Sequence, residues 1–486
     1  MNSTRNESYL NITPDALRFI RYLEFKMDCA AYQEQNPVGL DYDKVCRHID
    51  ELEVLQEEKV EALKAVMPKV PKIKKKSKPK NCFKKDGTHS THGEAWFKLL
   101  REKKLPPTWS KEVEVVSHYE DPNPNSTDQV KSWLYELGWK PSTYKYVREG
   151  DGSERKIEQV RKDGELSPCV VKLKDKAPEV EILEGLTIIQ HRLGIFKGFK
   201  ECALQQPDGT YRIKAEIGGL TNTLRFKHKK PLVNLPGVDK PWGHEIRSCL
   251  IATPGNELVG ADMVSLESTT KRHYITPHDP DYANMMSQEG FDEHLDLAIH
   301  AGALTERQVE AHKAGKEDHS KVRKAFKPVN YSAVYGVGKR KLSRETGMTM
   351  KEAEDLLAAY WDRNWAVRVV AKEQYVKRVG GYDWLKNPVS GIYHELRYDK
   401  DRFSTLNQST GVYLFDSWLI RAQRLGYNGV MQFHDETAGM SPLGKRQETL
   451  QKLETAIDNL NEDPNIKLNV TLGIDAKFGN NYAEIH

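Results

Sequence analysis

One stretch constrains the fold most, because its charged and aromatic side chains recur at every fourth position: RKAFKPVNYSAVYG, residues 323–336. The series consists of Arg323, Lys327, Tyr331 and Tyr335. A step of four residues on an α-helix turns by about 400° and rises about 6 Å, so we expect two cations and two rings along one slowly drifting face. A proline inside a helix removes one backbone hydrogen bond, so we expect a bend at Pro328.

Such a helix face suits a nucleotide. Cations near the helix start can neutralise phosphates, and a ring one or two turns later can pack against a base or a sugar. Gly336 lets the chain turn away at the helix end. Taken alone, the pattern is equally compatible with an amphipathic surface helix that carries an ordinary charged side.

Two apolar stretches each lead to a carboxylate. Residues 258–263 predict a buried strand that places Asp262 at the junction with a helix. Residues 427–440 predict a second apolar strand, with Asp435 and Glu436 at a turn. Separately, such acids are usually a helix cap or solvated surface groups. Together, two carboxylate-bearing strands on either side of a cationic helix are what two-metal phosphoryl transfer requires.

In combination, these stretches resemble motifs A, B and C of the family A (polymerase I-type) DNA polymerases, phage replicative type. That family has an aspartate followed five residues later by a glutamate, then R-x3-K-x3-[FY]-x3-Y-G, then H-D-E. GADMVSLES, the 323–336 stretch and QFHDETAG occur here in this order. The resemblance runs from about Leu17 to His486 and implies a template-directed DNA-dependent DNA polymerase that adds dNTPs to a primer 3′ hydroxyl.

The chemistry of phosphoryl transfer and the resemblance together imply a site with two Mg²⁺ ions. Asp262 and Asp435 would bridge the ions through hard oxygen ligands, and the backbone carbonyl of Met263 would add a ligand. Glu436 would be a weaker or water-mediated participant. By resemblance, Lys327 is the candidate proton donor to pyrophosphate.

The resemblance also assigns the substrate contacts. Arg323, Lys327 and His294 would hold the triphosphate, and Glu267 with Tyr331 would exclude a 2′ hydroxyl. The DNA contacts implied are Thr223, Arg225, Asn234, Tyr335, Gln408 and His434. Tyrosine in place of phenylalanine at position 331 implies that 3′-deoxy terminators are accepted. The chain departs from the family pattern at several positions: Leu224, Val233, Val264, Ser268-Thr269 and Ser404.

The fold class implied is α+β, a right hand with an antiparallel palm sheet, a helical thumb and helical fingers. The expected divisions are thumb base helices 1–67, basic insertion 68–112, thumb 113–210, first palm part 211–278, fingers 279–380 and second palm part 381–486. Thr13-Pro14-Asp15 predicts the start of a helix at 14–32, and Asp41 is expected to cap a second helix.

Residues 68–85 carry nine lysines, three prolines and no acid. We expect a flexible basic strip that contacts phosphates, or a solvated linker. In related phage polymerases, an insertion in this region recruits a processivity factor, so a factor bound at 68–112 is one expected partner.

The overall composition says less about function than the motifs do. Its 74 basic and 70 acidic residues nearly cancel, so a nucleic-acid surface must come from local clustering. Six cysteines without a C-x-x-C pair favour a reducing compartment, the bacterial host cytoplasm if the protein is viral. We expect no membrane span and no proofreading domain, with excision left to a separate 3′–5′ exonuclease subunit. The alternatives are a single-subunit RNA polymerase, against which Glu267 argues, and a non-catalytic template-binding subunit.

Overall fold

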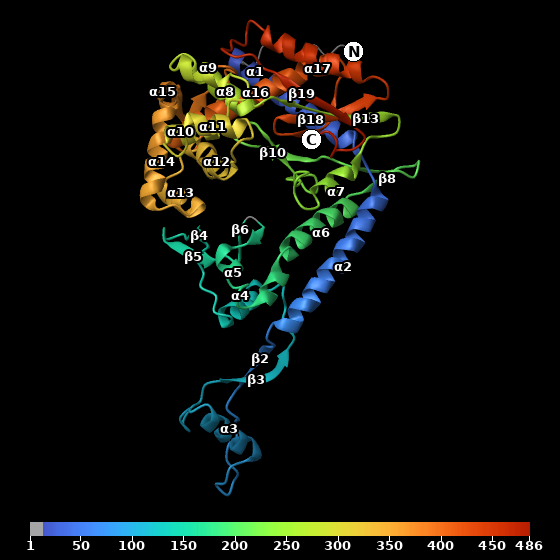
Figure 1. The fold of residues 1–486 in the computed structure, drawn as a ribbon. Helices are drawn as coiled ribbons and strands as arrows, with labels where there is room; N and C mark the ends of the chain where they lie inside the picture. The colour runs from blue at the N-terminus through green and yellow to red at the C-terminus, as the bar shows by residue number, and fades with distance from the viewer. Residues whose placement is uncertain (1–12, 163) are drawn as a thin grey trace. The chain divides into compact units, whose positions relative to one another are not determined.

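The computed structural model describes residues 13–162 and 164–486. The chain forms two compact units, Met1–Val45 with Lys197–His486 (unit 1) and Cys46–Phe196 (unit 2). Figure 1 shows their elements. Residues 1–12 of the predicted thumb base and residue 163 of the predicted thumb lie outside the described residues. Among the helices described, none is long and apolar enough to cross a membrane.

The centre of unit 1 is an antiparallel four-stranded sheet of order β17-β18-β13-β19. Its strands are β13 (Asn256–Met263), β17 (Gly429–Phe433), β18 (Glu436–Pro442) and β19 (Ile474–Gly479). Val259, Ala261 and Met263 belong to one hydrophobic core with residues of helices α16 (Arg402–Arg424) and α17 (Arg446–Asn461). A Cβ at Gly260 would lie 2.9 Å from Ile485, so the apolar run is buried on both sides of the sheet.

Eight helices lie between β13 and the later strands. They are α8 (Leu266–Ile275), α9 (Pro280–Met286), α10 (Glu293–His300), α11 (Glu306–Lys313), α12 (Ser320–Val334), α13 (Lys339–Thr346), α14 (Met350–Arg363) and α15 (Trp365–Glu373). The expected cationic helix is confirmed as α12, which continues through Pro328. Buried Phe326, Val329 and Ala333 attach one side of α12 to a core shared with α10 and α14. Away from this core, Lys327 is exposed and Arg323 is half-buried.

Smaller elements complete unit 1. A second sheet has the order β12-β1-β9-β8, from β1 (Val38–Leu40), β8 (Leu204–Gln205), β9 (Tyr211–Ile213) and β12 (Leu250–Ile251). The others are α1 (Pro14–Gln35), β10 (Ile217–Leu220), β11 (Phe226–His228), α7 (Gly243–Ser248), β14 (Val376–Val379), β15 (Tyr382–Lys386), β16 (Tyr393–Leu396) and η3 (Asp399–Asp401). The predicted start of α1 is confirmed, since the Thr13 hydroxyl accepts from the N–H of Ala16 at 3.2 Å. The Asp41 cap of the next helix is confirmed by its bond from the N–H of Lys44 at 3.0 Å.

Unit 2 is built from helices and short hairpins. These are α2 (Tyr42–Val66) and α6 (Leu186–Glu201), which both cross its boundaries, with β2 (Val70–Lys76), α3 (Thr91–Glu102), β3 (Val113–Glu120), α4 (Thr127–Glu136), β4 (Tyr144–Arg148), β5 (Glu154–Glu158), β6 (Arg161–Lys162), β7 (Glu165–Leu166), α5 (Pro168–Val171) and η2 (Pro178–Leu183). Its main core includes Leu63, Trp133, Leu134 and Leu183. A separate small core gathers Cys82, Trp96, Leu100 and Val113.

The structure corrects the prediction of a flexible strip at 68–85. Residues Val70–Lys76 form strand β2, which pairs antiparallel with β3 from Val70 opposite Glu120 to Lys76 opposite Val113. The valine-rich partner strand supplies a hydrogen-bonded edge that the lysine composition alone does not reveal. Every residue of β2 after Val70 is exposed, so the expectation that the segment has no core of its own holds.

Candidate active site

The two acids predicted to share metal ions lie on neighbouring segments of the central sheet. Asp262 is the next-to-last residue of β13, and Asp435 lies in the two-residue turn between β17 and β18. The backbone N–H of Met263 donates to the backbone carbonyl of Asp435 at 3.2 Å, which holds the segments together. Both acids are exposed. The structure thus brings together two carboxylates that are 173 positions apart in the sequence.

Two further carboxylates flank Asp262. The strand register places Glu436 of β18 and Asp475 of β19 directly opposite it. Opposite residues in an antiparallel sheet point to the same face. All three line a small hollow of about 80 Å³, together with Lys477. Asp475 was not predicted, because its run IDAKFG carries no motif and only the pairing of β19 with β13 brings it to the site.

Two acids of this cluster, Asp262 and Glu436, have raised pKa values. The pKa of Asp262 is raised first by partial loss of solvent and then by the charges of Asp475 and Asp435. Burial raises the pKa of Glu436 to about 7, although the Arg247 charge opposes the shift. A divalent cation would favour the ionised forms and so relieve this repulsion.

The donor set fits a hard divalent cation. Asp262 and Asp435 offer carboxylate oxygens, which Mg²⁺ prefers, and both remain accessible. Within residues 13–162 and 164–486, no group of three or more His, Cys, Asp or Glu side chains is arranged to hold a metal by itself. Mg²⁺ keeps several water or phosphate ligands, so two aspartates with a substrate phosphate suit it better than a closed protein cage.

A cavity of about 680 Å³ opens beside Asp435. Residues from α8, α10 and α12 line it, and the predicted nucleotide-binding residues among them are Glu267, His294, Arg323 and Tyr331. The volume is in the range of small-molecule sites. Lys327 does not line the cavity; it is exposed, with its Nζ 5.9 Å from the centre of the Tyr331 ring.

An ion pair and a helix cap order the cationic wall of this cavity. The Arg323 Nε donates to the Asp292 carboxylate at 2.6 Å. The other carboxylate oxygen of Asp292 accepts from the backbone N–H groups of His294 and Leu295 at 2.9 and 3.0 Å, which caps α10. The same contacts hold the pKa of Asp292 below its ordinary value despite partial burial. Arg323 and His294 are therefore fixed relative to each other.

Glu267 is held by residues predicted to contact DNA. The Tyr335 hydroxyl donates to the Glu267 carboxylate at 2.7 Å, and the Gln408 side-chain amide donates to the same hydroxyl at 2.7 Å. The Asn407 side-chain amide also donates to the Glu267 backbone carbonyl at 2.9 Å. These contacts join the end of α12 to α16 across the site. Loss of solvent and the Glu267 carboxylate raise the pKa of Tyr335 to about 12, so its hydroxyl stays a donor at neutral pH.

The remaining predicted DNA contacts divide into two groups. Arg225 and His434 line a hollow of about 60 Å³ with Glu267, Gln408 and Asp435. His434 has a positive φ of 59°, and burial followed by the Arg225 charge lowers its pKa to about 4. Thr223 is 3% exposed and bonds Thr221 at 3.0 Å, so its hydroxyl is already engaged. Asn234 is exposed and lines none of these hollows in the described part of the chain.

Sequence reasoning missed a charge cluster in the wall of the cavity, in which Lys271 is buried and Glu293 is half-buried. Glu293 accepts from Lys271 Nζ at 3.0 Å and from the Ser268 hydroxyl. Lys271 and Glu293 also line the cavity. Ser268 is a departure from the family pattern, and here its hydroxyl joins α8 to α10.

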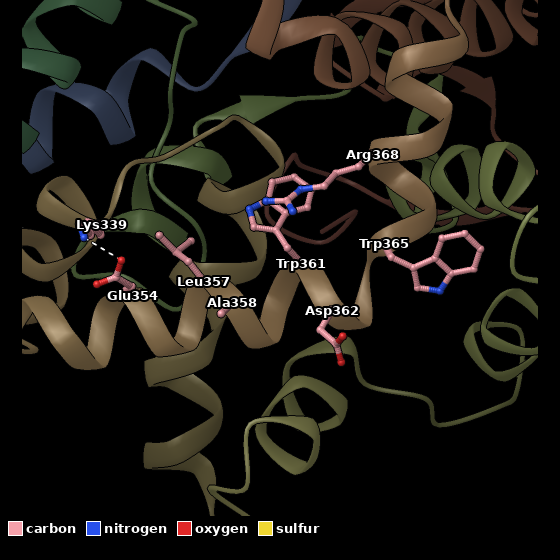
Figure 2. Close-up of a pocket in the computed structure, with 8 residues that line it drawn as sticks. All are labelled: Lys339, Glu354, Leu357, Ala358, Trp361, Asp362, Trp365 and Arg368. Atoms are coloured by element: carbon pink, nitrogen blue, oxygen red, sulfur yellow. Dashed lines mark hydrogen bonds and ion pairs between the residues drawn. The ribbon is translucent and has the colours of Figure 1, made fainter.

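Figure 2 shows a second hollow, of about 610 Å³, on helices α13 to α15. Its charges are largely engaged: Lys339 donates to Glu354 at 2.7 Å, and Arg368 lies over the Trp361 ring at 4.4 Å. None of the predicted catalytic, metal-binding or nucleotide-binding residues lines it. The predicted nucleotide-binding residues Glu267, His294, Arg323 and Tyr331 line the cavity beside Asp435 instead.

Comparison with known proteins gives this geometry a context. The sequence profile of DNA polymerase family A matches residues 104–382. A thermostable DNA polymerase I from Thermus filiformis is 25% identical over 279 residues, covering 54% of this chain and 31% of that protein. The DNA-directed DNA polymerase of Escherichia phage T7 is 22% identical over 404 residues, covering 75% of this chain and 53% of that protein.

A solved structure shows the same fold. The POL domain of Pol1 from M. smegmatis, in complex with DNA primer–template and dNTP, superposes with a TM-score of 0.67 at 17% identity. The likeness covers 97% of this chain and 72% of that one. The chain spans about a third to a half of the length of the two polymerases named above. Because the profile matches more than half of its 486 residues, the chain belongs to DNA polymerase family A.

Proposed function

We propose that this chain is a DNA-dependent DNA polymerase that joins dNTPs to a primer 3′ hydroxyl. One observation carries the proposal: Asp262 and Asp435 lie side by side, and Asp435 borders a cavity lined by Arg323 and His294. Nucleotidyl transfer needs acids that hold metal ions beside cations and donors that hold phosphates. The site offers both.

The right-hand divisions follow from this assignment. The sheet β17-β18-β13-β19 would be the palm and helices within 279–380 the fingers. Unit 2 would comprise part of the predicted thumb base, the insertion and most of the thumb. The fold likeness to a polymerase domain supports the assignment. The match to the phage T7 enzyme over 75% of the chain supports a phage-type replicative polymerase.

Asp262 and Asp435 would hold two Mg²⁺ ions, with the backbone carbonyl of Met263 as a further ligand. When bound, the ions would lower the basicity of the 3′ hydroxyl and neutralise charge on the transferred phosphate. Glu436, half-buried opposite Asp262, would take part through water. The pKa of Asp262 is raised mainly by partial burial, and the nearby charges of Asp475 and Asp435 add to the shift. A cation bound among these acids would be favoured by their charges.

The other side chains would bind and orient the substrates. Arg323 and His294 would hold the triphosphate from the cavity wall, and Lys327 would approach it from outside the cavity to protonate the departing pyrophosphate. Glu267 and Tyr331 would crowd the 2′ position of the sugar. The primer–template contacts proposed are Thr223, Arg225, Asn234, Tyr335, Gln408 and His434.

Two expectations concern partners. We propose that this chain extends primers without excising mismatched ends, and that a separate 3′–5′ exonuclease subunit removes them. The exposed lysines of β2 support phosphate contact by residues 68–112, where a processivity factor would also bind.

Primer extension by wild type, Asp262→Asn and Asp435→Asn tests the function. We expect Mg²⁺-dependent extension by wild type, and a loss of at least about 10³-fold in each variant, the scale of losing a main electrostatic group. Duplex binding should stay within a few-fold of wild type. A non-catalytic template-binding subunit would instead show no extension in any form. Extension by either variant at near wild-type rate would contradict the assignment.

A further inference from the structure

The side-chain amide of Asn330 contacts two groups at once. Its Nδ2 lies 3.0 Å from the backbone carbonyl oxygen of Glu293 and 3.0 Å from Nδ1 of His294. Asn330 is seven residues after Arg323, two helical turns along the same face of α12. Both residues line the cavity beside Asp435.

These two contacts determine which nitrogen of His294 carries its proton. A carbonyl oxygen only accepts hydrogen bonds, so the group facing Glu293 must be the amide NH₂. That NH₂ has two hydrogens, and the second faces His294 Nδ1. An imidazole nitrogen that accepts a hydrogen bond is unprotonated, and in the neutral ring the other nitrogen is then the donor.

We propose that Asn330 is a positioning residue that fixes His294 in the neutral tautomer with its proton on Nε2, aimed at the phosphates of the incoming nucleotide. The inference rests on the proposed function, because it takes the ligand of the cavity to be a nucleoside triphosphate. It adds a residue and a protonation state that neither the sequence motifs nor the comparisons assign.

The surroundings of His294 favour this neutral donor. Within the described residues, no hydrogen bond is formed by Nε2, so the ring edge opposite Asn330 is left for a ligand. The ring lies at the N-terminus of α10, where helix N–H groups disfavour a cation. Burial, with the Arg323 and Lys327 charges, lowers the pKa of His294, although Asp292 and Glu293 oppose the shift. A neutral ring makes the choice of tautomer decisive: Nε2–H attracts a phosphate oxygen and a bare Nε2 repels it.

The carbonyl that orients Asn330 is itself anchored. The Glu293 side chain accepts from Lys271 Nζ at 3.0 Å and from the Ser268 hydroxyl, both on α8. Lys271 is 7% exposed, so this ion pair is shielded from solvent. Glu293 of α10 is thus bonded to α8 through its side chain and to α12 through its backbone carbonyl. It fixes the orientation of the Asn330 side chain before a nucleotide arrives.

Asn330→Asp is the informative variant, because a carboxylate cannot donate and so draws the proton to Nδ1. We expect the KM for dNTP to rise about tenfold, the scale of one lost charge-assisted hydrogen bond, with kcat changed less than threefold. Asn465→Asp adds the same charge at an exposed position and should leave both constants unchanged. In a His294→Ala background, Asn330→Asp should add no further rise, since the effect passes through the imidazole.

A spectrum that does not depend on activity separates this inference from the proposed function. Long-range ¹H–¹⁵N spectra of histidine-labelled full chain identify the His294 signal by its absence in His294→Ala. We expect an unprotonated Nδ1 and a protonated Nε2 in wild type, and a protonated Nδ1 in Asn330→Asp. A protonated Nδ1 in wild type would overturn the inference even if the chain extends primers. Additive effects of the two substitutions on KM would also overturn it. Absence of primer extension would defeat the proposed function, and the spectrum would still decide the tautomer.

Discussion

Lys26→Met should destabilise unit 1 strongly, because it removes one partner of a buried ion pair. Lys26 on α1 is 3% exposed and Asp416 on α16 is fully buried. The Lys26 Nζ donates to both carboxylate oxygens of Asp416, at 3.0 and 2.8 Å. The carboxylate also accepts from the Tyr22 hydroxyl and, at 3.3 Å, from the Gln432 side chain. Gln432 is three residues before Asp435, so the pair supports the strand β17 that leads to this proposed metal ligand.

The magnitude follows from what each substitution leaves behind. Without Lys26, the Asp416 charge stays in the interior with only two neutral donors, which costs about 3–5 kcal/mol of unfolding free energy. Asp416→Asn leaves the ammonium of Lys26 unpaired and should cost a similar amount. The double variant leaves no buried charge, so its loss should be smaller than the sum of the single losses by about 2 kcal/mol.

Urea unfolding followed by tryptophan fluorescence measures these changes, because Trp418 is fully buried in the core that α16 shares with the sheet. Lys351→Met is the matched control, since Lys351 bonds Asp355 at 2.8 Å at the surface, where its side chain is 80% exposed. It should cause no measurable change. A Lys26→Met variant as stable as this control would refute the reasoning, as would fully additive losses in the double variant.

Three further changes test single side chains. Glu267→Ala should raise ribonucleotide incorporation by about tenfold or more relative to dNTP, measured as a ratio of kcat/KM, and an unchanged ratio would remove Glu267 from sugar selection. Tyr331→Phe should reduce incorporation of 3′-deoxy terminators in competition with dNTP, and equal incorporation would contradict the role of its hydroxyl. His394 is 3% exposed and burial lowers its pKa. His394 therefore binds a proton more readily in the unfolded chain than in the folded one, so the free energy of unfolding should fall as the pH drops below about 6.5. His394→Gln should lessen the fall in Tm between pH 7.5 and 5.5. An equal fall in Tm in wild type and His394→Gln would show that His394 does not cause the pH dependence of stability.

Local patterns predicted the elements that carry the site. The four-residue spacing of Arg323 and Tyr331 needs only helix geometry, and α12 follows it through Pro328. The apolar runs before Asp262 and Asp435 predicted strands, and the structure has strands there. Each of these patterns lies within about fifteen consecutive residues, so it can be recognised without knowing which distant segments pack together.

Non-local pairing accounts for what the sequence did not reveal. Asp475 reaches the site only because β19 pairs with β13 in one register, and a shift of one residue would turn it to the other face. The lysines of β2 form a strand because β3 lies beside them. Asn330 was within reach of sequence reasoning, since it is two turns from Arg323, but its role depends on the carbonyl of Glu293 from another helix.

The central claim is that Asp262 and Asp435 hold metal ions together at the site of nucleotide transfer. Anomalous diffraction from Mn²⁺ in crystals of the chain with a dideoxy-terminated primer–template and a matching dNTP tests it most directly. The account predicts two peaks about 4 Å apart, contacted by both carboxylates and by the triphosphate. A bound nucleotide without a metal peak at these two residues, or peaks held by other side chains, would contradict it.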